Sequence, residues 1–268
     1  MYLTGDTHGK VIERFSFRSN PGLRELTNED IVFVLGDFGQ PFGPETHKEA
    51  EYVFNFLNEK PWTTIVIGGN HDDYDYWQSC PQVNIFNGKA RQAQFNNKSF
   101  SVFFIDEITI LDIEQQHILC IPGAESHDAK NLLDPKDPMF KHKQKLLKRD
   151  FKFYRVIGKS WWPQEKMDIQ KNAEFIEHHI NEHFDLILSH DAPALINSWF
   201  KRSEEPARRK STAGQLFLEE LRKTLDFDMF IHGHFHFTGT WNKIYDDRVC
   251  GLYYEIIQLL NENSLTIV

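Results

Sequence analysis

Five short segments of the chain combine carboxylate, amide and imidazole side chains at spacings that could bind metal ions. They are Gly5-Asp6-Thr7-His8-Gly9, Gly36-Asp37, Gly69-Asn70-His71-Asp72, Ser189-His190 and Gly233-His234-Phe235-His236. These ligand types suit Mn, Fe, Zn or Mg ions, whereas sites for soft metals use thiolates. No cysteine lies in any of the segments. Together the segments predict a hydrolase that uses two divalent ions.

Each segment directly follows a hydrophobic run that is typical of a buried strand. The runs cover residues 1–3, 31–35, 64–67, 186–188 and 229–231, and they are rich in β-branched and aromatic side chains. Open α/β sheets build their binding sites at the carboxyl ends of neighbouring strands. We therefore expect the five segments to meet at one edge of the fold.

The order of the segments resembles the calcineurin-like metallophosphoesterases, whose pattern is D-x-H, G-D, G-N-H-[DE], a lone H and G-H-x-H. All five blocks are present in that order, and the match extends to about residue 257. The resemblance implies two metal sites that share Asp37. The first would be formed by Asp6, His8, Asp37 and His236, and the second by Asp37, Asn70, His190 and His234.

A carboxylate shared by two ions can hold them about 3.5–4 Å apart, close enough to share one water or hydroxide. Coordination lowers the pKa of that water toward about 7, so the bridging hydroxide is the expected nucleophile. In the family pattern His71 faces the substrate, and we predict that it donates a proton to the leaving oxygen. The alternative is that His71 supports the ligands. Asp72 or Asp73 would orient His71.

The second block departs from two better-known branches of the family. Protein Ser/Thr phosphatases continue it as G-D-x-x-D-R-G, whereas this chain has Gln40 and Pro41 where the Asp and Arg would stand. Purple acid phosphatases need a Tyr ligand at the position of Gln40. The sequence therefore predicts a phosphoesterase acting on a phosphomonoester or phosphodiester, on a phosphorylated small molecule or nucleotide, with Mn favoured. Alternatives are a nuclease, a phosphoprotein phosphatase, or a non-catalytic phosphate- or nucleotide-binding module.

Composition limits the classes of partner. The chain has 268 residues and a formal net charge of −9, which argues against a general nucleic-acid-binding surface without excluding a local basic patch. Its three cysteines do not suggest a disulfide framework. No stretch has the signature of a leader peptide or approaches the roughly 20 apolar residues of a membrane span. We expect a cytoplasmic protein that does not bind membranes, and the oligomeric state stays open.

Three stripes of apolar residues at helical spacing precede or connect the metal-binding segments, at residues 47–59, 169–180 and 218–225. Residues 83–121 instead contain short runs separated by polar turns, as in a strand meander, and residues 252–257 return to a strand. With the resemblance, this pattern predicts an α/β fold: a sandwich of two sheets flanked by helices (αββα), forming a single domain over residues 1–268.

Residues 124–166 are expected to form an insertion that acts as a lid or sets specificity. Ser126, His127 and Asp128 follow the strand-like run 118–121 and resemble a loop in a bacterial and phage branch of the family, so they are candidate substrate-binding residues. Residues 130–159 are rich in Lys, Arg and Phe with little periodicity. We expect this stretch to be a lid-like insertion that sets specificity.

Overall fold

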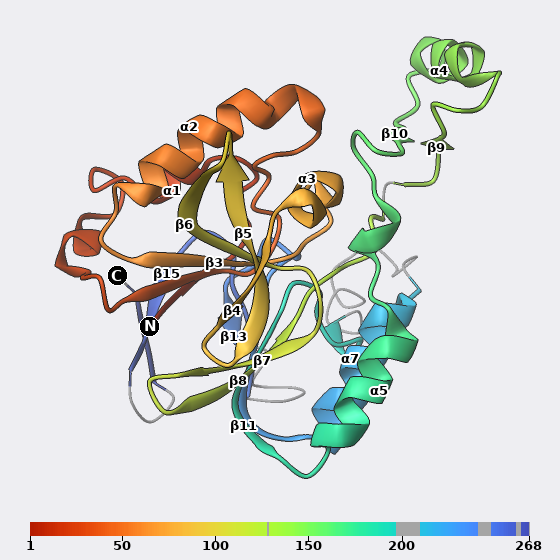
Figure 1. The fold of residues 1–268 in the computed structure, drawn as a ribbon. Coiled ribbons are helices and arrows are strands. Elements are labelled where there is room, and N and C mark those ends of the chain that lie inside the picture. Colours follow the sequence, from red (N-terminus) through yellow and green to blue (C-terminus); the bar gives the residue numbers. More distant parts are fainter. Residues whose placement is uncertain (128, 197–209, 241–247, 261–263, 268) are drawn as a thin grey trace.

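A computed structural model describes residues 1–268 except 128, 197–209, 241–247, 261–263 and 268. Two large sheets face each other, and helices cover their outer faces (Figure 1). The predicted α/β fold, a two-sheet sandwich flanked by helices, is confirmed. The first sheet has eight strands, in the order β16 (Ser264–Ile267), β15 (Ile256–Leu260), β1 (Tyr2–Thr4), β2 (Ile31–Val34), β3 (Thr63–Ile67), β6 (Lys98–Ile105), β5 (Gly88–Phe95) and β4 (Gln82–Ile85).

The second sheet has six strands. Their order is β13 (Gly239–Thr240), β14 (Val249–Gly251), β12 (Asp226–His232), β11 (His183–Ser189), β8 (Gln116–Ile121) and β7 (Thr109–Ile113). The central strands of each sheet run parallel: β1, β2, β3 and β6 in the first, and β8, β11, β12 and β14 in the second. Parallel pairing brings the carboxyl ends of these strands to a common edge within each sheet.

Alternation along the strands separates the core into layers. In β2, Ile31 and Phe33 lie in the apolar core between the two sheets, whereas Val32 and Val34 lie in the core beneath the outer helices. The same alternation holds in β11. Strands buried on both faces read as continuous apolar runs, which explains why periodicity alone does not reveal which sheet they belong to.

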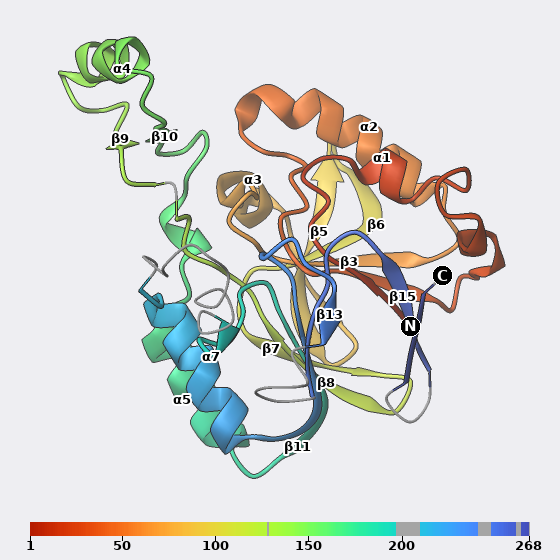
Figure 2. The same ribbon diagram turned by 180° about the vertical axis from the view of Figure 1, so that it is seen from behind.

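Helices α1 (Val11–Arg14), α2 (His47–Asn58) and α3 (Tyr74–Ser79) lie over the first sheet, and α5 (Ile169–His179) and α7 (Ala213–Thr224) over the second (Figure 2). The three predicted amphipathic helices are thus observed as α2, α5 and α7. In α2 the fully buried ring of Phe54 faces the sheet, and burying such a side chain contributes about 1.5–3 kcal/mol. Thr212 and Gln215 form a capping box that begins α7.

Short 3₁₀ turns join several of these elements. They are η1 (Pro21–Glu25), η2 (Pro44–Thr46) and η3 (Pro163–Glu165). Each begins at a proline, whose fixed φ suits the first position of a helical turn.

Three details differ from the sequence-based expectations. The meander is divided between the two sheets, because β4, β5 and β6 pair in the first and β7 and β8 in the second. The strand expected at residues 252–257 begins later, as β15 at Ile256. Residues 130–159, whose sequence shows little periodicity, contain helix α4 (Phe140–Arg149), which has no buried residue. A helix that fully buries none of its side chains needs no broad apolar stripe, so periodicity does not reveal it.

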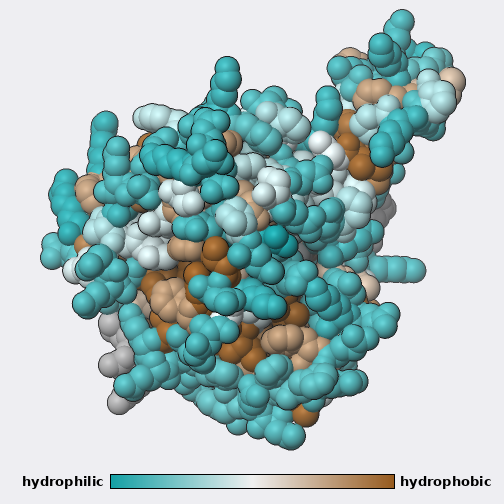
Figure 3. Space-filling model, viewed as in Figure 1, coloured by the Kyte–Doolittle hydropathy of each residue, from teal (hydrophilic) through white to brown (hydrophobic). Residues whose placement is uncertain are grey.

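Helix α4 stands away from the two sheets in both ribbon views (Figures 1 and 2) and forms the projection in the space-filling view (Figure 3). It is joined to the body through the short parallel pair of β9 (Leu132–Leu133) and β10 (Arg155–Val156). Among the described residues, no helix is both long and apolar enough to span a membrane. Cys80, Cys120 and Cys250 are buried free thiols.

Candidate metal centre

Seven side chains predicted to bind metal lie in the loops that follow five parallel strands. Asp6 and His8 follow β1, Asp37 follows β2, Asn70 follows β3, His190 follows β11, and His234 and His236 follow β12. The loops of the two sheets meet, so residues up to 230 positions apart in the chain come within contact distance. They form two groups.

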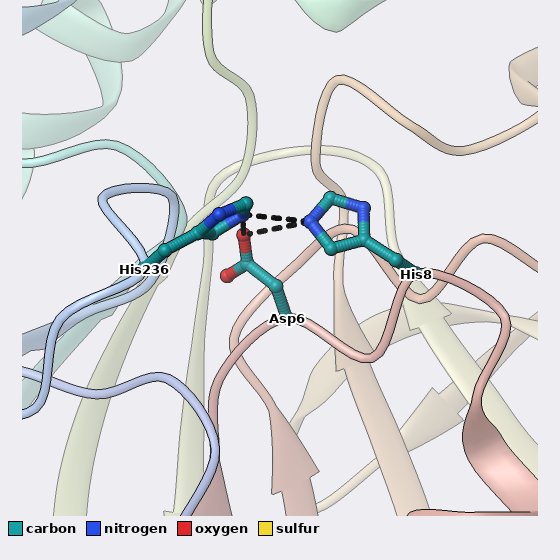
Figure 4. A group of neighbouring side chains, drawn as sticks. All are labelled: Asp6, His8 and His236. Carbon is teal, nitrogen blue, oxygen red and sulfur yellow. Dashed lines mark hydrogen bonds and ion pairs between the residues drawn. The ribbon is translucent and has the colours of Figure 1, made fainter.

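Asp6, His8 and His236 form the first group and point toward one another (Figure 4). Asp6 Oδ2 lies 3.2 Å from His236 Nε2 and 3.5 Å from His8 Nε2, and the two imidazole Nε2 atoms are 2.7 Å apart. Burial raises the pKa of Asp6, but the two imidazoles outweigh it and hold that pKa well below its usual range. A buried carboxylate and two convergent imidazoles fit a divalent cation.

Asp37, His190 and His234 form the second group, with ligand atoms within 4.8 Å of one another. His190 Nδ1 donates to the Leu35 carbonyl over 2.7 Å, and its Nε2 faces Asp37 Oδ1, 3.1 Å away. Such a hydrogen bond fixes the tautomer of a metal-binding histidine. Burial lowers the pKa of His190, but Asp37 outweighs burial and raises this pKa to about 10, so a divalent ion at His190 Nε2 would have to displace a proton. Burial, then the positive charge of His190, lower the pKa of His234 to about 3, so the His234 ring is neutral.

The amide of Asn70 is oriented as a metal ligand requires. Its Nδ2 donates to Ser126 Oγ over 3.1 Å, and its Oδ1 faces His190 Nε2 at 3.2 Å. The hydroxyl of Ser126 therefore holds the amide so that the oxygen, and not the nitrogen, points into the second group.

Asp37 lies between the two groups. Its Oδ1 is 3.1 Å from His190 Nε2, and its Oδ2 is 3.8 Å from His8 Nδ1. Burial raises the pKa of Asp37, but His190 outweighs it and keeps this pKa far below the ordinary value. The carboxylate is therefore charged, and its two oxygens face different ligand groups.

Four of the seven side chains sit on residues with left-handed backbone, His8, Asp37, His234 and His236, with φ between 45° and 65°. Non-glycine residues seldom adopt this conformation, and such strain is concentrated at functional sites.

A sequence model of the calcineurin-like phosphoesterase family matches residues 1–237, which include all seven side chains. The chain belongs to this family. It is accordingly a metal-dependent phosphoesterase, with clustered Asp and His side chains available for divalent ions.

Comparison with solved structures finds distant neighbours of this phosphoesterase. Phosphopantetheinyl hydrolase from Mycobacterium tuberculosis has 13% identity and a TM-score of 0.42, over 94% of this chain and 89% of its own. A putative 5′-nucleotidase from Staphylococcus aureus has 13% identity and a TM-score of 0.44, over 100% of this chain and 52% of its own. This chain thus spans about half of that nucleotidase. No curated protein matches the sequence.

In the phosphoesterase, His71 contacts a residue that the sequence motifs do not include. Arg155 Nη2 lies 3.1 Å from His71 Nε2, and its guanidinium is also 5.7 Å from the centre of the Phe42 ring. Arg155 is 3% exposed, and its Nη1 donates to the Ser160 carbonyl. In the sequence, Arg155 is marked only as a basic residue near the end of the insertion at residues 124–166.

His71 Nε2 is 4.0 Å from Asp37 Oδ2, so the ring lies beside the predicted ligands. A guanidinium cannot accept a hydrogen bond, so in this arrangement Arg155 donates and His71 Nε2 accepts. A fixed positive charge at Nε2 disfavours a metal cation at the same atom. His71 also forms, with His8 and Asp37, a third group whose atoms lie close enough to hold a metal ion. Its role as a proton donor and not a ligand stays a prediction.

Asp72, the other predicted catalytic residue, is buried and accepts two backbone hydrogen bonds. Its Oδ1 accepts from Gly39 N over 2.9 Å, and its Oδ2 accepts from Gly69 N over 2.8 Å. Burial, followed by the charge of Asp37, raises the pKa of Asp72 to about 7. Asp72 thus joins the loops after β2 and β3. Asp73 caps α3 and lies 3.1 Å from the ring of His47.

Two of the three candidate substrate-binding residues lie near the centre. Ser126 contacts Asn70 and donates its backbone N–H to Glu165 Oε1 over 3.0 Å. His127 is exposed and close enough to His234 for its charge to affect that ring. Asp128 lies outside the described residues. Glu165, which the motifs do not include, is fully buried, and burial first of all raises its pKa to about 7.

Replacing Gly69 by Ala should disrupt both ligand groups. A Cβ at this position would lie 2.2 Å from Asp37 N, 2.4 Å from Asp37 Oδ1 and 3.0 Å from His190 Nε2. We expect loss of bound metal and a destabilisation of about 1–3 kcal/mol, typical of overpacking, in elemental analysis and thermal unfolding. Gly214→Ala is the matched control, because its Cβ would first meet the flexible Met167 side chain at 3.2 Å. Normal metal content in Gly69→Ala would contradict the placement of Asp37.

Proposed function

We propose that this phosphoesterase holds two divalent ions and hydrolyses a phosphomonoester or phosphodiester of a small molecule or nucleotide. Asp6, His8, Asp37 and His236 would hold one ion, and Asp37, Asn70, His190 and His234 the other. The observation that carries the proposal is the position of Asp37, whose Oδ1 faces His190 and whose Oδ2 faces His8. A single carboxylate placed in this way can serve both ions.

When bound, the two ions would supply an activated water as nucleophile and neutralise charge on the phosphate oxygens. Mn is the ion we favour, because carboxylate, amide and imidazole ligands suit it. The protein residues then have to orient the phosphate and serve the leaving group. His71 and Arg155 are placed for these two tasks.

Arg155 would bind a phosphate oxygen, and His71 would deliver a proton to the leaving oxygen. The second block has Pro41 where the protein Ser/Thr phosphatases have an Arg, so it supplies no positive charge there. The guanidinium of Arg155 would supply this charge instead. When a phosphate oxygen accepts from Arg155, His71 Nε2 is released from that hydrogen bond and can carry the proton instead. Phe42 stacks on the ring of His71, with centroids 5.2 Å apart, and holds its orientation.

We also propose that residues 124–166 are a specificity insertion in a single domain of residues 1–268. Its support is that the segment supplies side chains to the centre from both of its ends: Ser126 orients Asn70, and Arg155 contacts His71. Ser126 would thus act through Asn70, while the exposed His127 would contact substrate. Asp72 would act by holding the two ligand loops together.

The test is metal analysis followed by a substrate screen on the purified chain. We expect about two ions per chain after Mn reconstitution, and hydrolysis of bis-p-nitrophenyl phosphate or p-nitrophenyl phosphate that EDTA abolishes. Cyclic nucleotides and single-stranded DNA complete the screen and separate monoester from diester preference. One ion or none would rule out the dinuclear centre. Two ions without hydrolysis of any ester would favour a non-catalytic binding module.

A further inference from the structure

Residues 130–159, here called the arm, carry a charge opposite to that of the rest of the chain. The arm contains ten of the 30 Lys and Arg residues but only three of the 39 Asp and Glu residues. The protein as a whole has a net charge of −9. The arm therefore has a net charge of +7, whereas the rest of the chain has 20 Lys and Arg against 36 Asp and Glu.

The lysines of the arm face solvent. Helix α4 buries no residue, and Lys141, Lys145 and Lys148 along it are exposed, as is Lys152 just after it. Among the described residues, the ion pairs found on the helix are Lys143 with Asp137 and Arg149 with Asp150. Within the described part of the chain, no ion pair involves Lys141, Lys145, Lys148 or Lys152, so the arm presents a positive surface.

Two aromatic rings lie among these charges. Phe151 is 98% exposed and Phe153 is 60% exposed, directly after α4. A fully exposed Phe gains nothing from folding, since burial of apolar surface is what stabilises such side chains. Basic side chains combined with exposed aromatic rings are the combination that binds single-stranded nucleic acid, in which bases stack on the rings.

The arm leads directly to the candidate metal centre. Strands β9 and β10 tie its base together, and Asn131 Nδ2 donates to the Phe153 carbonyl over 2.7 Å. The guanidinium of Arg155 lies 5.5 Å from the centre of the Phe153 ring and 3.1 Å from His71. A strand with one phosphate at His71 could thus continue past Phe153 onto the lysines.

We propose that the arm binds single-stranded nucleic acid and that the phosphoesterase acts on a phosphodiester of the bound strand. The proposal rests on the proposed metal-dependent phosphodiester hydrolysis at the centre, and it names a polynucleotide as the substrate in place of a small molecule or free nucleotide. Phosphate charges match the lysines, unpaired bases match the exposed Phe rings, and the path to His71 connects both to the reaction. In a duplex the bases stay paired and stacked on one another, so no base would be available to stack on the ring of Phe151.

Binding is measured by fluorescence anisotropy with labelled single-stranded oligothymidylate and full-length protein in EDTA, so that no cleavage occurs. In one variant Lys141, Lys145, Lys148 and Lys152 are all changed to Gln. We expect its affinity at 50 mM salt to fall at least about tenfold, and the slope of log affinity against log salt to become shallower by about 3, since each phosphate contact on a single strand contributes about 0.7. All four side chains are exposed, so folding should be unaffected.

The matched control changes Lys48, Lys89, Lys171 and Lys223 to Gln, which removes the same charge from exposed positions on the body. Its affinity and salt slope should equal those of the original protein. Phe151→Ala should weaken binding by roughly 5- to 150-fold, the usual value of one base–aromatic stack. Tyr52→Ala, which removes a 66% exposed ring on α2, should not.

Several outcomes would overturn the proposal. Equal losses in the arm and body variants would mean that binding is non-specific. If the oligonucleotide does not bind, two further measurements assign the arm. Lysine-dependent binding to vesicles of anionic lipid would indicate a membrane, and lysine-dependent self-association in sedimentation would indicate a second copy of the chain. Hydrolysis of small esters by the Mn-loaded protein tests the centre separately, so a failure there is distinguishable from a failure of the arm.

Discussion

Asp37→Asn should remove both metal ions and lower phosphoester hydrolysis by more than about 100-fold. Changes to residues that merely support metal ligands already cost about 10- to 100-fold, and Asp37 faces both ligand groups. Asn has the same shape but no charge, so the geometry of the loop is retained. The measurements are elemental analysis after Mn reconstitution and the rate of ester hydrolysis at saturating metal.

His8→Ala is the comparison for Asp37→Asn, because His8 belongs to the first group and its ring is partly exposed. It should lose one ion and less activity. Asp75→Asn, an exposed carboxylate in α3, should change neither. Thermal unfolding in EDTA verifies that each variant is folded. Equal losses in Asp37→Asn and His8→Ala would count against a shared carboxylate.

His71→Asn should slow hydrolysis of an alkyl or ribose phosphate ester by roughly 10²–10⁴-fold, the usual range for general acid catalysis. A p-nitrophenyl ester should be affected much less, because its phenolate leaves without a proton. Metal content should stay near two ions per chain. The measurements are steady-state rates on the two kinds of ester and elemental analysis of the same preparation.

Three variants separate this role of His71 from metal binding. His190→Ala and His234→Ala should lose the second ion and both activities together. His47→Asn, a partly exposed histidine that contacts Asp73, should change neither. If His71→Asn lost metal, or slowed good and poor leaving groups equally, His71 would be a ligand or a phosphate-binding residue instead.

The elements that can be predicted from the sequence are those whose residues form a pattern within a short stretch of the chain. Helix α2 was predictable because its buried residues recur at helical spacing, and β2 because its apolar run ends at Gly36. The division of the meander between two sheets was not. It depends on β6 pairing with β3 and β8 with β11, contacts between residues about 38 and 68 positions apart. Helix α4 gives no clear periodic signal because none of its residues is buried.

Some residues of the candidate site can likewise be predicted from the sequence, and others cannot. Motif order pointed to Asp6, Asp37 and His190 because each follows a strand, and parallel pairing requires strand ends to meet at one edge. Their metal-binding roles stay predictions, although the structure brings the side chains together. Arg155 had no such signal, since its contact with His71 spans 84 positions and depends on the short pairing of β9 with β10.

The family, the types of candidate ligand and the strands that carry them follow from the sequence alone, because strand formation and side-chain chemistry are local properties. The position of Asp37 between the two groups, and the orientation of Asn70 by Ser126, are visible only in the folded protein. The path from the basic arm to His71 through Arg155 is likewise visible only there. These arrangements depend on the packing of two sheets against each other, which no short stretch of sequence specifies.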